Sequence, residues 1–477
     1  LACVDSSFAF YRFMLSYIDI AIVAGFLVFT LWIGLRQRHS PQSANEAQNY
    51  LLGGRMLTLP SFVATTVSTW YGGILGIGEY TWLYGISNWL VFGVPYYVGA
   101  ILFALLLSKR ARQSDVLTLP ERFERHYGGA CAKCAGWLIF LTSLPGAYVL
   151  ITATLCAWCF QISVPFGIVS TAVFIVAYLW RGGFTSLVKT DVIQIFLMFG
   201  SFILLTSILL VGYGLEPLRS LPETHFEPTG GQPLSAVLVW YVIALSTLTE
   251  PNFFQRCFAA KTPEIARHGL LISVACWAFF DLMTTTCGLY ARALLPDLAN
   301  PIDAFPALAT AVLPIGLVGV FFAGLFATVL STLDSKIFTT ATTIARDIWP
   351  NGAFSHWTMT RKTRIGLIIA AIAASIIAYL SGSVVSIWKV FGSVSAAALL
   401  IPILATYFPK WIRLTPIGAF VLMLASSIVT CVWFASKYMT QDGYWLGLEP
   451  LFAGAIVAIA IAVVDNIGLR WREASRS

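Results

Sequence analysis

Long apolar runs alternate with short polar segments along almost the whole of this chain. Most runs have roughly 18 to 25 residues, the length that a helix needs to cross the hydrocarbon core of a bilayer. Thirteen runs fit this description, and we predict that each forms a membrane-spanning helix. Their approximate limits are 16–35, 59–77, 82–107, 130–161, 164–180, 183–211, 234–258, 269–295, 315–345, 365–381, 385–408, 416–436 and 451–467.

The composition supports a membrane protein. Of 477 residues, 58% are hydrophobic and 11% are charged, whereas a soluble chain of this length needs far more charge to cover its surface. The prediction is an all-α polytopic protein in a lipid bilayer, at the plasma membrane or bacterial inner membrane. The first run follows one basic residue, Arg12, and precedes no small-residue cleavage site, so we expect a spanning helix and not a cleaved signal peptide.

The net charge of +7 does not indicate nucleic-acid binding, because Lys and Arg collect in alternate short loops. The basic loops contain Arg36, Arg38, Arg55, Lys109, Arg110, Arg112, Arg181, Arg267, Arg361, Lys362, Arg364, Lys410, Arg413, Arg470 and Arg472. The other loops are acidic, with Arg219 and Lys437 as exceptions, and contain Glu216, Glu223, Glu227, Asp297, Asp303, Asp442 and Glu449. Basic loops face the cytoplasm, which predicts an external N-terminus, a cytoplasmic C-terminus and an odd number of spans. Between two spans, "SDVLTLPERFERHYGG" predicts an amphipathic helix in the membrane interface.

Nine cysteines include two pairs with zinc-like spacing, Cys131 with Cys134 and Cys156 with Cys159. The pairs lie near opposite ends of one predicted helical region, too far apart for tetrahedral coordination of one zinc ion. We therefore interpret them as buried thiols and expect no transition metal and no cofactor.

Two predicted spans are interrupted. The second contains "ATTVSTWYGGILGIGEY", in which four glycines follow small and hydroxylated residues and loosen the helix. The seventh contains "LSTLTEPNFFQR", in which Pro251 removes a backbone hydrogen bond. A small-residue packing face and a simple proline kink are the alternatives. The two interruptions open two consecutive groups of five spans, and this is the pattern of a transporter built from inverted repeats with a central binding site.

A polar stripe lies within the ninth span, in "VLSTLDSKI". Hydroxyl-bearing residues at spacings of three and four share one helix face; they are Thr328, Ser331, Thr332 and Ser335. A lone hydroxyl in such a helix usually bonds the carbonyl four residues earlier, but the carboxylate of Asp334 needs a partner because a charge at mid-membrane costs several kcal/mol. Together these oxygen donors suit a small alkali cation.

Other charged residues also lie within predicted spans, and three of them are candidates for a specific role. Asp191 is a second buried carboxylate and a candidate cation ligand, whereas Asp281 has no evident partner and suits a packing or gating role. Lys389 either lies near the outer surface and snorkels to the interface or contacts the solute.

Five segments resemble the sodium:solute symporters, the relatives of the proline, pantothenate, sialic acid, choline and sodium–glucose carriers. They are "YLLGGRMLTLPSFVATTVST", "TLPERFERHYGG", "GGFTSLVKTDVIQ", "EPNFFQRCFAAK" and "GLFATVLSTLDSKIFTTATTIARDIW". The resemblance covers about residues 50–408 and implies a leucine-transporter-type inverted repeat of five plus five helices, preceded by one helix and followed by two. The implied parts are 1–49 with the first helix, 50–213 as the first repeat, 214–408 as the second repeat with an outer loop, and 409–477 as two helices and a basic tail.

The resemblance also implies cation ligands. The main sodium site would use the carbonyls of Ala64, Val67 and Thr328 and the hydroxyls of Ser331 and Thr332. A second sodium site would use Asp191, Ser331, Asp334 and Ser335. Many members have an uncharged residue at the position of Asp334, although the choline-type branch also has an aspartate there, so this residue binds either sodium, a proton or the solute.

The implied solute site lies between the two interrupted helices. Its expected residues are Trp70, Tyr71, Glu250, Asn252, Phe253, Trp388 and Lys389. The aromatic set favours a small cationic or zwitterionic solute, whereas Lys389 favours a carboxylate.

The sequence therefore predicts a sodium-coupled symporter of a small organic solute that works by alternating access, with Na⁺ as the coupling ion and a monomer as the expected state. A proton-coupled carrier that uses Asp191 or Asp334, and a sodium-linked sensor, are the alternatives. An enzyme is not expected, because no nucleophile–base set or metal cluster lies near the predicted cavity.

Overall fold

The computed structural model describes residues 15–36, 46–349, 356–381, 383–439 and 443–475, with the side chains of 472–474 excepted. Arg38, Asp442 and the side chain of Arg472, which entered the orientation argument, lie outside the described part. The first half contains α1 (Tyr17–Arg36), α2 (Glu46–Leu52), α3 (Leu59–Ser68), α4 (Ile74–Tyr84), α5 (Val94–Leu102), α6 (Ser108–Gln113), α7 (Leu119–Tyr127), α8 (Gly129–Ser143), α9 (Gly146–Phe160), α10 (Val164–Leu179) and α11 (Gly183–Tyr213). The second half contains α12 (Leu234–Ile243), α13 (Pro251–Ala259), α14 (Pro263–Leu294), α15 (Ala304–Val312), α16 (Leu317–Thr343), α17 (Met359–Ser381), α18 (Val384–Tyr407), α19 (Pro416–Ala435) and α20 (Pro450–Ala474).

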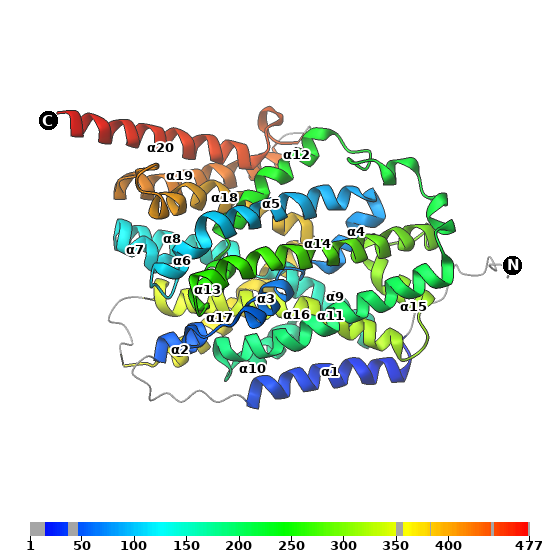
Figure 1. Cartoon of the computed structure of the whole chain (residues 1–477). Helices are drawn as coiled ribbons and strands as arrows, with labels where there is room; N and C mark the ends of the chain where they lie inside the picture. Colours follow the sequence, from blue (N-terminus) through cyan, green and yellow to red (C-terminus); the bar gives the residue numbers. More distant parts are fainter. Residues whose placement is uncertain (1–14, 37–45, 350–355, 382, 440–442, 476–477) are drawn as a thin grey trace.

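The helices form one bundle with their long axes roughly aligned (Figure 1). Within the described residues, eleven helical stretches are long and apolar enough to cross a membrane. They match eleven of the thirteen predicted spans. The other two predicted spans are the interrupted pair α3–α4 and the shorter apolar helix α10. The amphipathic helix predicted in segment 114–129 is α7.

Two of the differences from the predicted helix limits have a clear local cause. Residues Trp82 to Tyr84 continue α4 and do not begin the third span, because Gly85 takes a positive φ of 60° and ends the helix. The predicted helix 130–161 is divided into α8 and α9 around Leu144 and Pro145. Proline has no N–H for the helical ladder and its ring clashes with the preceding turn, so the division follows from the sequence.

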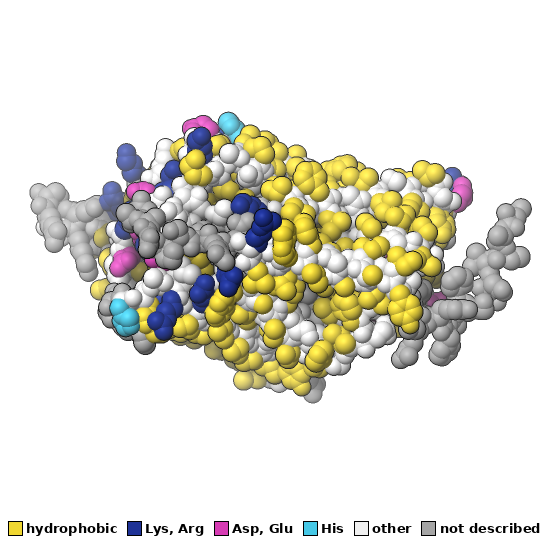
Figure 2. All heavy atoms as spheres, turned by 90° about the horizontal axis from the view of Figure 1, so that it is seen from below, with side chains coloured by type: hydrophobic (Ala, Val, Ile, Leu, Met, Phe, Trp, Pro, Cys, Tyr) yellow, Lys and Arg dark blue, Asp and Glu magenta, His cyan; other side chains and the backbone are white. Residues whose placement is uncertain are grey.

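The surface carries a broad hydrophobic belt, as expected of a bundle in lipid. Figure 2 shows this belt across the middle of one face, with most Lys and Arg side chains gathered towards the left end of the view. Exposed large apolar side chains lie on the outer helices, among them Phe196, Ile372 and Val464. In contrast, α16 is buried along nearly its whole length, so it forms the core around which other helices pack.

Carboxylates in the first and last helices, α1 and α20, stabilise the starts of α16 and α19. The carboxylate of Asp19 in α1 accepts hydrogen bonds from the backbone N–H groups of Gly316 (2.8 Å) and Gly319 (2.7 Å) at the start of α16. Asp465 in α20 likewise accepts from the backbone N–H (2.6 Å) and hydroxyl (2.7 Å) of Thr415, which precedes α19. Because the first N–H groups of a helix lack internal partners, a carboxylate there stabilises the start of the helix.

The opposite end of α16, which continues to Ile348, is held by α7. Glu121 accepts hydrogen bonds from Arg346 (2.9 Å), from Arg125 (2.6 Å) and from the backbone N–H of Leu117 (2.8 Å). Thr118 also donates to Asp347 (2.8 Å). Burial by itself would raise the pKa of Glu121, but the Leu117 N–H and the two guanidinium groups together lower it below its usual range.

We therefore predict that Glu121→Gln destabilises the protein in a pH-dependent way. Because the pKa is lowered in the folded state, the stabilisation is present above the ordinary value of 4.5 and is lost as the pH falls through the folded value. At pH 7 the loss is about 1 kcal/mol, seen as a fall of a few degrees in apparent Tm in detergent. Glu124→Gln, an exposed change on the same helix, is the control. A Tm difference that does not shrink on acidification would contradict the prediction.

Candidate cation and solute site

The first interruption lies where α3 stops beside α16. α3 ends at Ser68, residues 69–73 are not helical, and α4 begins at Ile74. The hydroxyl of Thr69 donates to the carbonyl of Thr65 (2.7 Å), which satisfies one carbonyl of the last turn. The prediction that this span is interrupted is thus confirmed, and the glycines explain how other elements approach it. A Cβ on Gly72 would lie 2.5 Å from Thr332, and a Cβ on Gly73 would lie 2.0 Å from the Trp388 indole.

The second interruption lies between α12 and α13. Residues Ala244 to Thr249 form a tighter 3₁₀ segment, Glu250 is extended, and Pro251 begins α13. Glu250 also caps α13, because its carboxylate accepts from the backbone N–H of Asn252 (3.3 Å). Proline is favoured in the first helical turn, where its missing N–H has no partner to lose.

The predicted main sodium ligands come together where these elements meet. Ala64 and Val67 belong to α3, and the stripe residues Ser331 and Thr332 belong to α16; all four are buried. The hydroxyl of Ser331 donates to the carbonyl of Ser68 across the two helices at 2.5 Å. The structure therefore places the unwound end of α3 directly against the polar face of α16.

The hydroxyls of the stripe differ in their hydrogen bonding. Thr328 donates to the carbonyl of Gly324 (2.7 Å), the local bond that a lone threonine in a helix is expected to make. Thr332 has a buried hydroxyl with no hydrogen-bond partner among the described groups. The Val67 carbonyl accepts from the indole N–H of Trp277 (3.2 Å) and from the backbone N–H of Trp70 (3.3 Å), so both of its lone pairs have donors.

Asp191 in α11 and Asp334 in α16 are fully buried. One oxygen of Asp191 accepts from the Thr65 hydroxyl, and the other has no partner among the described groups. Both oxygens of Asp334 also lack hydrogen-bond partners there, although the Tyr178 phenol lies close to it and bonds Thr190. Buried carboxylate oxygens without donors are costly, and a cation is the usual means of satisfying them.

Arg256 in α13 is a fully buried cation that the sequence interpretation missed. Its guanidinium donates to Ser335 (2.6 Å) and to Thr65 (3.2 Å), and it lies 3.9 Å from Asp191. The sequence signal was available, because a charged residue inside a predicted span is rarely unpartnered. Its position five residues beyond Pro251 also places it just after the interruption.

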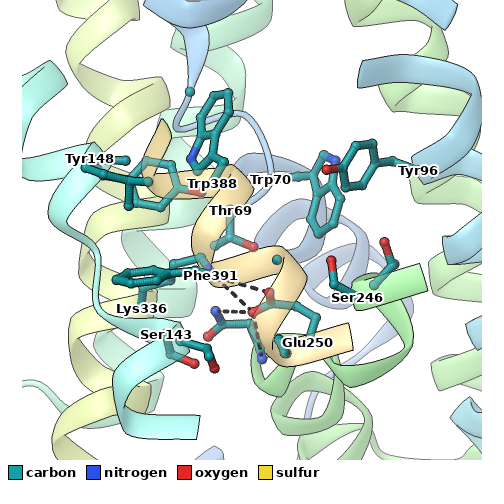
Figure 3. A pocket seen from close by; sticks show the side chains of 18 of the residues that line it. Thr69, Trp70, Tyr96, Ser143, Tyr148, Ser246, Glu250, Lys336, Trp388 and Phe391 are labelled. Atoms are coloured by element: carbon teal, nitrogen blue, oxygen red, sulfur yellow. Dashed lines mark hydrogen bonds and ion pairs between the residues drawn. The ribbon is translucent and has the colours of Figure 1, made fainter. Parts of the chain in front are cut away.

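A cavity of about 170 Å³ lies between the two interruptions and α16. Six of the seven residues predicted to contact the solute line it: Trp70, Tyr71, Glu250, Asn252, Phe253 and Trp388. Figure 3 shows Trp70 and Tyr96 on one side of the cavity and Tyr148 and Trp388 on the other. Trp70 also stacks on Phe253, with ring centroids 4.9 Å apart. The predicted solute residues are thus brought together, with one exception.

The exception is Lys389, which does not line the cavity. Its ammonium pairs with Glu449 at 2.9 Å and lies 5.4 Å from the centre of the Tyr444 ring. The residue in contact with the cavity is instead Lys336, next to the stripe, which bonds both carboxylate oxygens of Glu250 at 3.1 Å. The sequence identified Lys336 as part of the polar segment but could not indicate its partner, 86 residues earlier.

The remaining candidates are Asp281, which has a hydrogen-bond partner, and the two cysteine pairs, which are free thiols. Asp281 also lines the cavity and accepts a hydrogen bond from the Tyr97 phenol. Cys131 and Cys134 lie in α8, whereas Cys156 and Cys159 lie in the last part of α9. The cysteines in the described part of the chain are free thiols, and no group of three metal-binding side chains occurs there.

Comparison with known proteins gives the same fold and class. Residues 50–426 match the sequence model of the "Sodium:solute symporter family". The chain is 24% identical over 466 residues to a sodium/proline symporter of Haemophilus influenzae, covering 88% of this chain and 89% of that protein. It is 25% identical over 412 residues to a sodium/pantothenate symporter of the same organism, covering 80% and 83%. These relatives are transporters, so the prediction that this chain is not an enzyme is confirmed.

Among solved structures, a Na⁺-coupled sialic acid symporter in a substrate-bound outward-open state superposes with a TM-score of 0.77, at 18% identity over 95% of this chain and 97% of that chain. A nucleobase-cation-symport-1 family transporter in a closed conformation superposes with a TM-score of 0.55, at 13% identity over 88% and 94%. These similarities confirm the predicted leucine-transporter-type fold.

The contact between Gly73 and Trp388 leads to a prediction. Gly73→Ala places a methyl group inside the indole, so we expect a loss of about 2 kcal/mol in stability from overpacking, measured as a lower apparent Tm. Gly76→Ala is the matched control, because its Cβ would meet the same indole at an ordinary 3.4 Å. In a Trp388→Ala background the cost of Gly73→Ala is expected to disappear. Additive losses in the double variant would mean that the indole is not the constraint.

Proposed function

Because the chain belongs to the sodium:solute symporter family, we propose that it couples Na⁺ entry to uptake of a small organic solute by alternating access. Sodium-coupled symport in the plasma membrane is the function of the family, and the two interruptions packed against α16 are what the mechanism requires. The single observation that carries the cation site is the buried Thr332 hydroxyl without a partner, at the point where α3 unwinds.

The main sodium ion is proposed to bind between α3 and α16. Its ligands would be the carbonyls of Ala64, Val67 and Thr328 and the hydroxyls of Ser331 and Thr332. Hard oxygen donors suit an alkali cation. The existing hydrogen bond of Ser331 is compatible with this role, because a hydroxyl that donates keeps its lone pairs. The Val67 carbonyl accepts two hydrogen bonds, so binding of the ion would replace one of these two donors. An ion there would join the unwound segment to α16.

A second sodium ion is proposed at Asp191, Ser331, Asp334 and Ser335. The charges support this site: if both carboxylates are ionised, the single Arg256 guanidinium, 3.9 Å from Asp191, compensates only one of them. One monovalent cation would neutralise the other. Each sodium ion that enters supplies about 2.3 kcal/mol per 100 mV of membrane potential, so this ion would double the electrical driving force for solute.

The proposed orientation has the C-terminus in the cytoplasm and the N-terminus outside. The gathering of Lys and Arg side chains at one end of the bundle supports it (Figure 2). A single chain is proposed to form one transport unit, since the cavity and the proposed cation ligands all belong to one chain.

The first test concerns the main sodium site. Ser331→Ala combined with Thr332→Ala is expected to raise the Na⁺ concentration for half-maximal thermal stabilisation by at least about tenfold, since two of five ligands are lost. Na⁺ is titrated against purified protein with K⁺ at constant ionic strength. Thr343→Ala, which removes a hydroxyl bonded locally to Thr339 in the same buried helix, is the control. An unchanged Na⁺ midpoint in the double variant would place the ion elsewhere.

The second test counts ions. Equilibrium binding of ²²Na⁺ to purified protein is expected to give about two ions per chain, and Asp334→Asn is expected to reduce this to about one. Asp115→Asn, a change at an exposed carboxylate that pairs with the buried Arg55, should leave the number unchanged. One ion in both the wild type and Asp334→Asn would refute the second sodium site, and a proton on Asp334 would then account for the buried charge.

A further inference from the structure

The ion pair between Glu250 and Lys336 forms one end of the cavity (Figure 3). Glu250 lies at the interruption between α12 and α13, and Lys336 projects from α16, so the pair joins the two elements that border the cavity. The side chains are 18% and 15% exposed. A carboxylate and an ammonium held this deep in a membrane protein stabilise the fold poorly, because desolvation offsets their attraction. Charges in such a position most often serve binding.

Glu250 and Lys336 can both form further hydrogen bonds to a ligand. One oxygen of Glu250 also accepts from the Asn252 side-chain amide (2.9 Å), whereas among described groups the other receives only Lys336. The Lys336 ammonium has three N–H groups, and the bonds that it makes in the described structure go to Glu250 alone. A ligand that approaches from the cavity therefore meets one exchangeable acceptor and one exchangeable donor side by side.

Aromatic side chains are the largest group in the rest of the cavity lining, beside several Ser and Thr residues. Trp70 and Tyr96 face Tyr148 and Trp388 across it, and Phe391 lies near the ion pair (Figure 3). Asp281, the other charged residue in the described lining, is already bonded by Tyr97. The cavity thus offers paired opposite charges at one end and an apolar wall beyond them.

We infer that the transported solute is a zwitterion of the α-amino acid type, with its ammonium on Glu250, its carboxylate on Lys336 and an apolar side group against the aromatic wall. This inference rests on the proposed symport function and specifies its substrate class. A cationic amine bound to Glu250 would leave Lys336 without an anionic partner, and a carboxylic acid bound to Lys336 would leave Glu250 without a cationic one. A zwitterion replaces both partners at once, because its two charged groups are neighbours.

The inference is tested by ligand-dependent thermal shift of the purified full chain in NaCl and in KCl. The probes are the standard L-amino acids, each compared with its decarboxylated amine and its deaminated acid. At least one apolar amino acid is expected to raise the Tm in NaCl, with an apparent affinity about tenfold or more above that of its amine and its acid. An amine or acid that binds as tightly as the amino acid overturns the inference, as does the absence of a shift with every amino acid.

Charge variants provide a second readout that loss of folding cannot imitate. Lys336→Met is expected to reverse the preference in favour of the amine, and Glu250→Gln in favour of the acid, each measured as a ratio of affinities within one protein. Lys109→Met and Glu264→Gln remove the same groups from a solvent-facing pair (3.3 Å) and should retain the wild-type preference. Unchanged preference in both cavity variants would overturn the inference.

The effect of Na⁺ alone on stability distinguishes failure of the inferred substrate class from failure of the proposed function. If Na⁺ stabilises the protein but no zwitterion is preferred, the substrate class is wrong and sodium coupling stands. If Na⁺ has no effect, the proposed function fails.

Discussion

A helix that stops inside a membrane leaves backbone carbonyls and N–H groups that lipid cannot satisfy. In this protein some of these groups find partners nearby, as the Thr65 carbonyl does in Thr69 and the Asn252 N–H does in Glu250. One buried helix, α16, contacts both interruptions. At the first, Ser331 donates to the Ser68 carbonyl. At the second, Lys336 bonds the Glu250 carboxylate and Thr339 donates to the Asn252 side chain at 2.7 Å. Polar side chains of a single helix therefore hold both irregular segments.

This shared helix links the cation ligands to the cavity. The α16 residues proposed to bind sodium and the lysine that lines the cavity lie close together on this helix, between Thr328 and Lys336. Arg256 extends the link to α13 through Ser335 and Thr65. A change in charge at Asp334 is consequently felt by groups on each side of the cavity, without any need for a long path through the protein.

Much of this arrangement could be predicted from the sequence, because helix breaks and helix faces are determined by residues that are close together in the chain. The glycines near Gly72 and the proline at Pro251 identify interruptions, and spacing alone puts the hydroxyls of α16 on one face. Pairing could not be predicted, because it depends on how helices far apart in sequence are rotated and placed. Lys336 and Lys389 look equivalent in sequence, yet one meets Glu250 in the cavity and the other meets Glu449 outside it. The division at Pro145 was predictable from proline chemistry, but the long apolar run outweighed it.

The capping of α16 by Asp19 has a mechanical consequence. A helix fixed at one end behaves as a lever, and at 1.5 Å per residue Ser331 lies about 22 Å and Arg346 about 45 Å from Gly316. A tilt of roughly 5° about that fixed end would move Ser331 by about 2 Å and Arg346 by about 4 Å. The first displacement is as large as the distance between sodium and a ligand, and the second is enough to part Arg346 from Glu121. The spanning helix α1, outside the predicted repeats, thus fixes the end of α16 about which any tilt of that helix would turn.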